Sequence, residues 1–184
     1  SRSSSAAESR IGAGYIGMEL STVFAELGSD VTVVEMLDDV LPGYEDDVAR
    51  VVRTRADAKG VEFHFGEGAT GWRDAADGGV VVTTETEDGE ESTYGADRVL
   101  KAVGREPITD TLDAEEAGLD PTDDGSFGTD ERCETDVDGI YAVGDAAGDP
   151  MLAHAASAEG VVAAEAIAGE PAAFDTRAIP AAVF

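Results

Sequence analysis

The stretch SRIGAGYIGMELSTVFAELGSDVTVVE, residues 9–35, decides the expected fold of this chain. It carries glycines at positions 12, 14 and 17, in the spacing of a dinucleotide-binding turn, and it reaches Glu35 at the end of a later apolar run. In such a turn the first glycine permits the tight bend and the second lets the backbone approach a pyrophosphate. The third lets the helix and the strand pack closely. The stretch therefore predicts a nucleotide-binding turn.

The residues around this turn show the periods of a helix and a strand. Apolar residues recur at helical spacing from Ile16 to Leu27, Gly28 stands where a helix ends, and DVTVVE (30–35) has the β-branched composition of a strand. The turn should also follow a buried strand, but only Ile11 represents one here. We therefore expect the leading strand to be missing and residues 1–10 to be an unplaced or altered N-terminus.

Further along, the same signals predict a helix within residues 41–60 and a strand over 61–65. From residue 79 the period changes to two, with a hairpin turn at Asp88-Gly89 and a returning strand over 97–104. These elements predict an α/β fold: a Rossmann-type FAD/NAD-binding domain with an antiparallel β meander, ending near residue 105.

A second region follows an acidic linker over residues 113–125. Its pattern predicts a short strand over 139–145 and an alanine-rich helix over 152–169. We see no internal repeat, so the two regions are expected to fold differently.

Charge is the strongest compositional signal. The chain has 40 Asp and Glu against 12 Lys and Arg, a net charge of −28, and the acids are spread along its whole length. Such a surface repels nucleic acid and anionic membranes, and dispersed acidity with scarce lysine is typical of a cytoplasm rich in salt. The chain also lacks a membrane-length apolar run or a signal peptide, and its single cysteine, Cys133, excludes an internal disulfide. We expect a soluble, cytoplasmic, halophilic protein.

Glu35 indicates which dinucleotide the turn binds. It lies 18 residues beyond Gly17 at the end of a strand, where a carboxylate accepts hydrogen bonds from a ribose 2′-hydroxyl and repels a 2′-phosphate. No arginine follows it in MLDD (36–39) to accept such a phosphate. NAD is therefore favoured over NADP.

Four segments together resemble the dihydrolipoyl dehydrogenase family of flavoprotein disulfide reductases: GAGYIGMELSTVFAELGSDVTVVE, VLKAVGREPIT, GIYAVGDAAGDPMLAHAASAEG and IPAAVF. The resemblance runs from Ile11 to Phe184 in the family's order. It implies an NAD-binding domain over 11–105 and the second segment of an FAD-binding domain over 106–184. The first FAD segment, with its redox cysteine pair, and the dimerisation domain have no counterpart in this chain.

The resemblance also implies roles for particular residues. Glu19 is placed next to the nicotinamide ring, although an acid near the positive end of a helix has the same appearance. Tyr15 matches a position that covers the empty nicotinamide pocket. Asp145 matches the aspartate that binds the ribityl chain, although an Asp that caps the next loop looks identical in sequence. The full cofactor-binding set is Gly12, Gly14, Tyr15, Ile16, Gly17, Glu19, Glu35, Gly104 and Arg105 for NAD, and Asp145, Met151, Leu152, Ala153 and His154 for FAD.

No catalytic residue is expected within this chain. A lone Cys133 cannot cycle through an internal disulfide, and the family's acid–base histidine comes from the partner subunit. His64 and His154 lack ligands at metal-binding spacing, so no metal site is expected.

The resemblance implies that the full-length enzyme transfers electrons from dihydrolipoamide, carried on a lipoyl-protein, through a thiol pair and FAD to NAD. It implies a homodimer that serves a 2-oxoacid dehydrogenase complex and binds neither nucleic acid nor membrane. Two alternatives stay open. One is another pyridine-nucleotide disulfide reductase, of the mercuric reductase or NADH oxidase type, and the other is a catalytically silent NAD-binding module.

Overall fold

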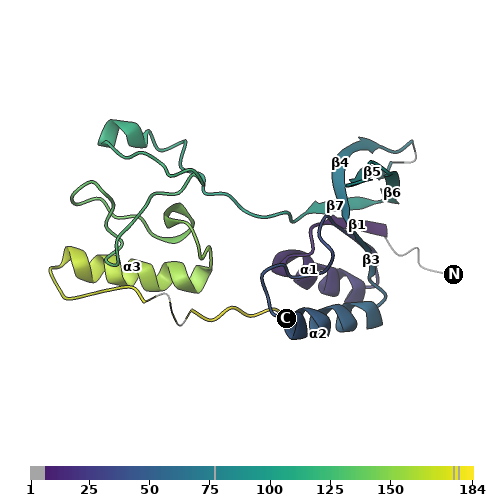
Figure 1. Cartoon of the computed structure of the whole chain (residues 1–184), viewed down its shortest axis with the longest axis horizontal. Helices are drawn as coiled ribbons and strands as arrows, with labels where there is room; N and C mark the ends of the chain where they lie inside the picture. The colour runs from purple at the N-terminus through teal and green to yellow at the C-terminus, as the bar shows by residue number, and fades with distance from the viewer. Residues whose placement is uncertain (1–6, 77, 176, 178) are drawn as a thin grey trace. The chain divides into compact units, whose positions relative to one another are not determined.

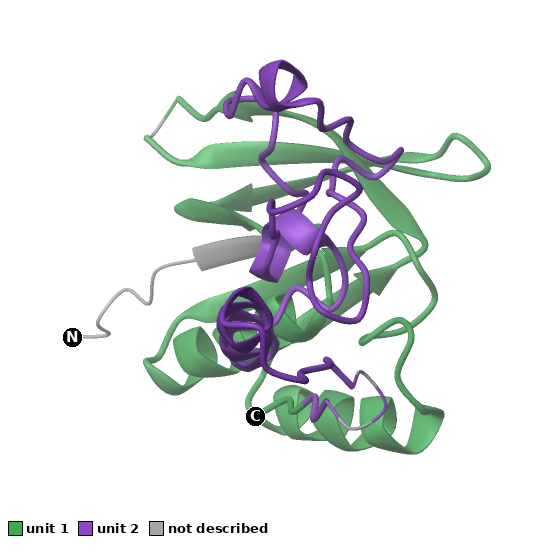
Figure 2. Ribbon diagram, turned by 90° about the vertical axis from the view of Figure 1, so that its left-hand side faces the viewer, with its two compact units in different colours: residues 1–104, 182–184 green, residues 105–181 purple. Residues whose placement is uncertain are grey.

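The computed structural model describes residues 7–76, 78–175, 177 and 179–184. The chain divides into two compact units: unit 1 comprises residues 1–104 with 182–184, and unit 2 comprises residues 105–181 (Figure 2). In the described residues, unit 1 holds two β-sheets and two α-helices, whereas unit 2 holds one long α-helix and two short 3₁₀ helices.

The larger sheet of unit 1 is parallel and has the strand order β3-β2-β1-β7. Its strands are β1 (Ala7–Ile11), β2 (Asp30–Glu35), β3 (Glu62–Phe65) and β7 (Arg98–Lys101). The helix α1 (Tyr15–Glu26) connects β1 to β2, and α2 (Asp46–Ala58) connects β2 to β3. Since β7 returns to the other side of β1, the direction of winding reverses between β1 and β7, which is where nucleotides bind in such sheets.

Alternation along β2 determines which side chains meet the helices. Val31 and Val33 belong to the buried cluster that also contains Met18 of α1 and Ala49 and Ala56 of α2. Both helices therefore cover one face of the parallel sheet (Figure 1).

The smaller sheet is an antiparallel meander in the order β4-β5-β6. Its strands are β4 (Glu67–Asp74), β5 (Val80–Thr86) and β6 (Glu91–Ala96). The ring of Tyr94 in β6 lies 4.5 Å from the ring of His64 in β3. His64 is paired with Val34, one residue along from Val33, so it faces away from the helices. The meander therefore packs on the face of the parallel sheet opposite α1 and α2.

Unit 2 has little regular structure. Its elements are η1 (Ala114–Ala117), η2 (Gly144–Ala147) and α3 (Ala153–Ile167). Polar side chains hold its turns: Asp124 accepts hydrogen bonds from the backbone N–H and hydroxyl of Ser126 at 3.0 and 2.6 Å, and the Thr109 hydroxyl donates to the Gly125 carbonyl at 2.5 Å.

The structure confirms the helix that ends just before Gly28 and the helices within 41–60 and 152–169. It also confirms the strands over 30–35 and 61–65 and the hairpin at Asp88-Gly89. It corrects four expectations. Residues 7–11 do form the leading strand, because both neighbours, β2 and β7, pair with its backbone whatever its side chains are. The strand that follows the hairpin, β7, joins the parallel sheet, and the third strand of the meander is the unexpected β4.

The other two corrections concern unit 2. Residues 139–145 form no strand: Tyr141 makes only an isolated bridge to Glu134, and the chain then enters η2. The acidic segment 113–125 is part of unit 2 rather than a linker, since Asp124 and Gly125 are tied to their neighbours by the bonds above. Residues 1–6 lie outside the described part of the chain. None of the described helices has the length and apolar character that crossing a bilayer requires.

Candidate functional site

The glycine turn lies at the carboxyl end of β1, and two of its glycines are required by space. Gly12 has φ +98°, and a Cβ on it would lie 2.4 Å from the carbonyl oxygen of Ala102. A Cβ on Gly17 would lie 2.0 Å from the carbonyl oxygen of Gly12. Only glycine at both positions lets β1, the residues after β7 and α1 approach so closely.

Gly14 differs from these two glycines. It is the N-cap of α1 with φ −66°, which any residue adopts, and a Cβ on it would meet nothing within 4 Å. Among the described residues, no side chain caps this helix. Open space at an uncapped helix N-terminus is the environment that a phosphate group requires, because the helix presents N–H donors and partial positive charge there.

Glu35 connects the end of β2 to this turn. The residue is 7% exposed; one carboxylate oxygen accepts the N–H of Ala13 at 2.6 Å, and the other accepts the N–H of Leu37 at 3.0 Å. Each carboxylate oxygen has a second lone pair, so these bonds leave acceptor capacity for hydroxyl groups.

Leu41 is a second support that the sequence did not indicate. Its N–H donates to the carbonyl of Ala13 at 2.8 Å, and its φ of 56° is rare for a leucine. Glu35 and Leu41 thus hold both backbone polar groups of Ala13, and the turn is fixed without any ligand.

Four more residues expected around NAD lie in unit 1. Tyr15 and Ile16 begin α1 and are half-buried, and the half-buried Glu19 accepts the N–H of Phe184 at 3.2 Å. Gly104, with φ +126°, ends unit 1 shortly after β7. The carboxyl ends of β1, β2 and β7 lie at one edge of the sheet. Eight of the expected residues end or follow these strands in unit 1: Gly12, Gly14, Tyr15, Ile16, Gly17, Glu19, Glu35 and Gly104.

The other six expected residues belong to unit 2. Asp145 lies in the first turn of η2, and its carboxylate is 3.4 Å from the guanidinium of Arg105. Their side chains are 49% and 39% exposed, so this ion pair is open to solvent. The structure therefore places Arg105 with the residue expected at the flavin and in a different unit from Gly104.

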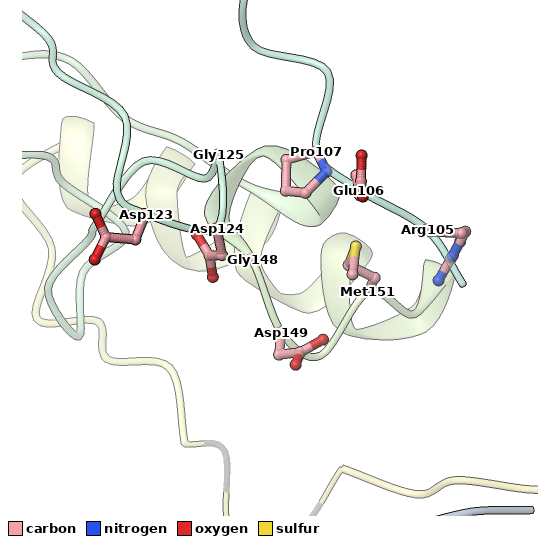
Figure 3. A pocket seen from close by; sticks show the side chains of 9 residues that line it. All are labelled: Arg105, Glu106, Pro107, Asp123, Asp124, Gly125, Gly148, Asp149 and Met151. Carbon is pink, nitrogen blue, oxygen red and sulfur yellow. The ribbon is translucent and has the colours of Figure 1, made fainter. Parts of the chain in front are cut away.

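The start of α3 carries the rest of this group. Met151 and Leu152 are half-buried, Ala153 and His154 are exposed, and the His154 Nε2 lies 2.7 Å from the carbonyl oxygen of Pro180. Met151 and Arg105 line one pocket of about 550 Å³ (Figure 3). The other lining residues are Glu106, Pro107, Asp123, Asp124, Gly125, Gly148 and Asp149.

The acidic wall of this pocket contains one carboxyl group with a shifted pKa. Hydrogen bonds from Ser126 and Thr122 stabilise the charged form of Asp124 and lower its pKa to about 2. In the described residues, no three His, Cys, Asp or Glu side chains are grouped to hold a metal ion.

Glu159 is the functional candidate that sequence reasoning missed. It is 7% exposed in α3, and its carboxylate accepts the N–H of Gly144, directly before Asp145, at 2.6 Å. A signal was available, because position 159 lies four residues from both Ala155 and Ala163, on the buried face of the helix.

Cys133 is also buried in unit 2, with its thiol 3.7 Å from the backbone carbonyl oxygen of Glu159. Burial raises the pKa of its thiol, and the charges of Glu159 and Asp130 raise it further. The raised pKa keeps the thiol protonated, and the protonated form is a poor nucleophile.

Comparison with known proteins gives consistent results. Dihydrolipoyl dehydrogenases from Haloferax volcanii and Halobacterium salinarum are 67% and 61% identical to this chain over 95% of its length. The chain spans only 37% and 36% of those relatives. The crystal structure of LpdA from Mycobacterium tuberculosis matches 92% of this chain, and 36% of its own, with a TM-score of 0.83 and 30% identity.

A more distant structure, the HOCl-induced flavoprotein disulfide reductase RclA from Escherichia coli, matches 91% of this chain and 37% of its own, with a TM-score of 0.80 and 27% identity. The family model for the pyridine nucleotide-disulphide oxidoreductases matches residues 7–160. With the glycine turn, Glu35 and the parallel sheet in the arrangement described above, the chain belongs to the pyridine nucleotide-disulphide oxidoreductase family.

Proposed function

We propose that this chain is the NAD-binding domain and the second FAD-binding segment of a dihydrolipoyl dehydrogenase, which converts dihydrolipoamide and NAD⁺ to lipoamide, NADH and a proton. The observation that carries the proposal is the braced turn of unit 1, in which Gly14 leaves open space beside an uncapped helix and Glu35 lies at the neighbouring strand end. The 67% identity to the Haloferax volcanii enzyme supports the choice within the family.

The residues of unit 1 fit an adenine dinucleotide. The space at Gly14 and the N-terminus of α1 would receive the pyrophosphate, and Glu35 would accept hydrogen bonds from the adenosine ribose. A 2′-phosphate would be repelled by the Glu35 carboxylate, so NAD is preferred to NADP. Glu19 and Tyr15 would border the nicotinamide, and Gly104 would close the site. On this proposal residues 11–105 are the NAD-binding domain.

Unit 2 fits one part of a flavin site. The half-exposed carboxylate of Asp145 is available to polyol hydroxyls, and Met151, Leu152, Ala153 and His154 would border the ring system. On this proposal residues 106–184 are the second segment of the FAD-binding domain, with Arg105 at its junction. When bound, FAD supplies the redox chemistry between the thiols and NAD, and the protein supplies binding and orientation.

Because Cys133 is the chain's single cysteine, a dithiol–disulfide cycle cannot run within these 184 residues. We therefore place the thiol chemistry on other parts of the enzyme. We further propose that the whole enzyme is a cytoplasmic homodimer that acts on a lipoyl-protein of a 2-oxoacid dehydrogenase complex, and that it is adapted to high salt, as its net charge of −28 indicates.

The likeness to RclA keeps another flavoprotein disulfide reductase as the second candidate, although its 27% identity is far below the 67% and 61% of the two dihydrolipoyl dehydrogenases. A silent NAD-binding module is the third candidate, since unit 1 contains a complete turn.

The test is a graft. These 184 residues replace the matching segment of the Haloferax volcanii enzyme, and the product is assayed in molar salt. We expect NAD reduction with dihydrolipoamide, and none by the 184-residue chain alone. Two results would contradict the proposal. One is a folded graft with bound FAD that fails to reduce NAD with dihydrolipoamide, and the other is a graft that prefers Hg²⁺ or O₂ as the acceptor of electrons from NADH.

A further inference from the structure

The middle of α3 carries a carboxylate on a face that is otherwise made of alanines. Glu159 is buried together with Ala155, Ala163 and Ala166, and its carboxylate accepts the N–H of Gly144 at 2.6 Å. Burial of a charged group is unfavourable unless hydrogen bonds compensate for lost water. A carboxylate at this position therefore points to a role that alanine could not fill.

Close packing brings α3 to the turn. A Cβ on Gly144 would lie 3.1 Å from the Cβ of Ala156, and Gly144 has φ +68°. A small residue on the helix and a glycine in the turn thus let the backbone come within reach of the Glu159 side chain, one helical turn beyond Ala156. A second contact, from the Cys133 thiol to the backbone carbonyl of Glu159 at 3.7 Å, joins the same part of the helix to the rest of unit 2.

The bonded N–H belongs to the residue directly before Asp145. The turn at Gly144 begins η2, and it presents the half-exposed carboxylate of Asp145 in the first turn of that helix. We propose that Glu159 is a positioning residue for the flavin site, whose buried carboxylate fixes the Gly144-Asp145 turn so that Asp145 is preorganised for the hydroxyls of the ribityl chain. This inference rests on the FAD site proposed above.

The test uses the grafted holoenzyme and four variants: Glu159→Ala, Glu159→Gln, Asp145→Ala and the double variant Asp145→Ala/Glu159→Ala. Glu165→Ala is the matched control, because Glu165 is exposed on the same helix. The measurements are the dissociation constant of FAD, obtained by flavin fluorescence, and the hydrogen-exchange rate of the Gly144 amide in the apoenzyme.

We expect Glu159→Ala to weaken FAD binding about tenfold, because a charge-assisted hydrogen bond is lost. In the apoenzyme the same variant should expose the Gly144 amide to exchange. Glu159→Gln, which keeps an acceptor oxygen, should restore most of the FAD affinity and most of the protection of the Gly144 amide. When Asp145 is already alanine, adding Glu159→Ala should weaken FAD binding by less than about threefold, because a residue that acts through Asp145 has nothing left to position.

Two results would overturn the inference. One is an unchanged FAD affinity in Glu159→Ala, and the other is an effect of equal size with and without Asp145. If Asp145→Ala itself leaves FAD binding unchanged, the proposed FAD site is wrong, and the inference fails with it. The Gly144 exchange rate would still show whether Glu159 holds the turn.

Discussion

Units 1 and 2 form their candidate sites by different means. Unit 1 buries large side chains, such as Met18, Leu41 and Val33, beneath a turn whose glycines are set by steric contact. Among the described residues of unit 2, the buried apolar side chains are Phe127, Cys133 and four alanines, and polar bonds from Asp124, Thr109 and Glu159 hold its loops. One site rests on a hydrophobic core and the other on hydrogen bonds.

The two units also differ in their density of negative charge. Unit 1 has 21 Asp and Glu against 9 Lys and Arg over 107 residues, a net charge of −12. Unit 2 has 19 Asp and Glu against 3 Arg over 77 residues, a net charge of −16. The unit with the smaller apolar core therefore carries the greater density of negative charge. We therefore expect the stability of unit 2 to depend more strongly on salt concentration than that of unit 1. We expect the stability of unit 1 to depend more strongly on side-chain volume added at its glycine turn.

The largest effect should follow Gly17→Val in unit 1. The added side chain would meet the Gly12 carbonyl at a distance of 2.0 Å already at its Cβ, so we expect loss of NADH and NADPH binding together and a destabilisation of about 3 kcal/mol or more. Calorimetric titration and thermal melting in molar salt measure these. Gly14→Ala is the matched change: its Cβ meets no atom, so stability should be kept while affinity falls. Equal loss of stability in the two variants would contradict the steric account.

Dilution of salt should distinguish the units next. The Debye length grows from about 3 Å at molar salt to about 30 Å at 0.01 M, so repulsion among carboxylates extends over a whole unit. As salt is diluted, we expect the α3 amides of unit 2 to lose protection from hydrogen exchange first. Unit 1 should unfold only at a lower salt concentration. Protection of the β2 amides, followed in the same exchange experiment, reports on unit 1. Simultaneous unfolding of both units would refute the comparison.

Glu35→Ala should have a smaller effect, confined to unit 1. NADH affinity should fall about tenfold, and the preference for NADH over NADPH should narrow, because the substitution removes the carboxylate that we propose as the ribose ligand. Stability should fall as well, since the buried Ala13 N–H loses its acceptor. Glu62→Ala, an exposed acid on the adjacent strand, is the control. If the NADH:NADPH ratio does not change, Glu35 is not the ribose ligand.

The smallest effect concerns Asp124 and pH. Its pKa is lowered to about 2 by the hydrogen bonds of Ser126 and Thr122, so the stability that it contributes is complete above its unfolded pKa and is lost as pH falls through the folded value. Between pH 4 and pH 2, wild-type unit 2 should therefore lose more stability than Asp124→Asn, which has no charge to lose. Hydrogen exchange of the Ser126 amide follows this region. Parallel pH profiles of wild type and variant would contradict the assignment.

The accuracy of the sequence predictions follows the same division. Residues 15–35 have a strong helical or β period and produced the expected elements. The polar residues before Ile11 gave no such signal, because β1 is formed by backbone pairing with strands on both sides. β4 was missed because its glycines and the bulge between Ala69 and Gly71 interrupt alternation.

In unit 2 the apolar run at 139–143 resembles a strand, yet no partner strand runs alongside it in the described residues. The individual roles of Gly12 and Gly17 could be assigned from their spacing, since steric demands repeat wherever this turn occurs. The bond from Glu159 to Gly144 could not, because a side chain and an amide that meet across a turn leave no period in the sequence.

The central position of β1 also sets an order of events during synthesis. Its register pairs Glu8 with Val31 on one side and Glu8 with Arg98 on the other, so the sheet is complete only after about ninety further residues have left the ribosome. The hairpins of the meander, which join neighbours in the sequence, can form in the meantime. The glycine turn precedes Ala102 by about ninety residues in the sequence, so it must wait for nearly all the rest of unit 1 to be translated before Ala102 closes over Gly12.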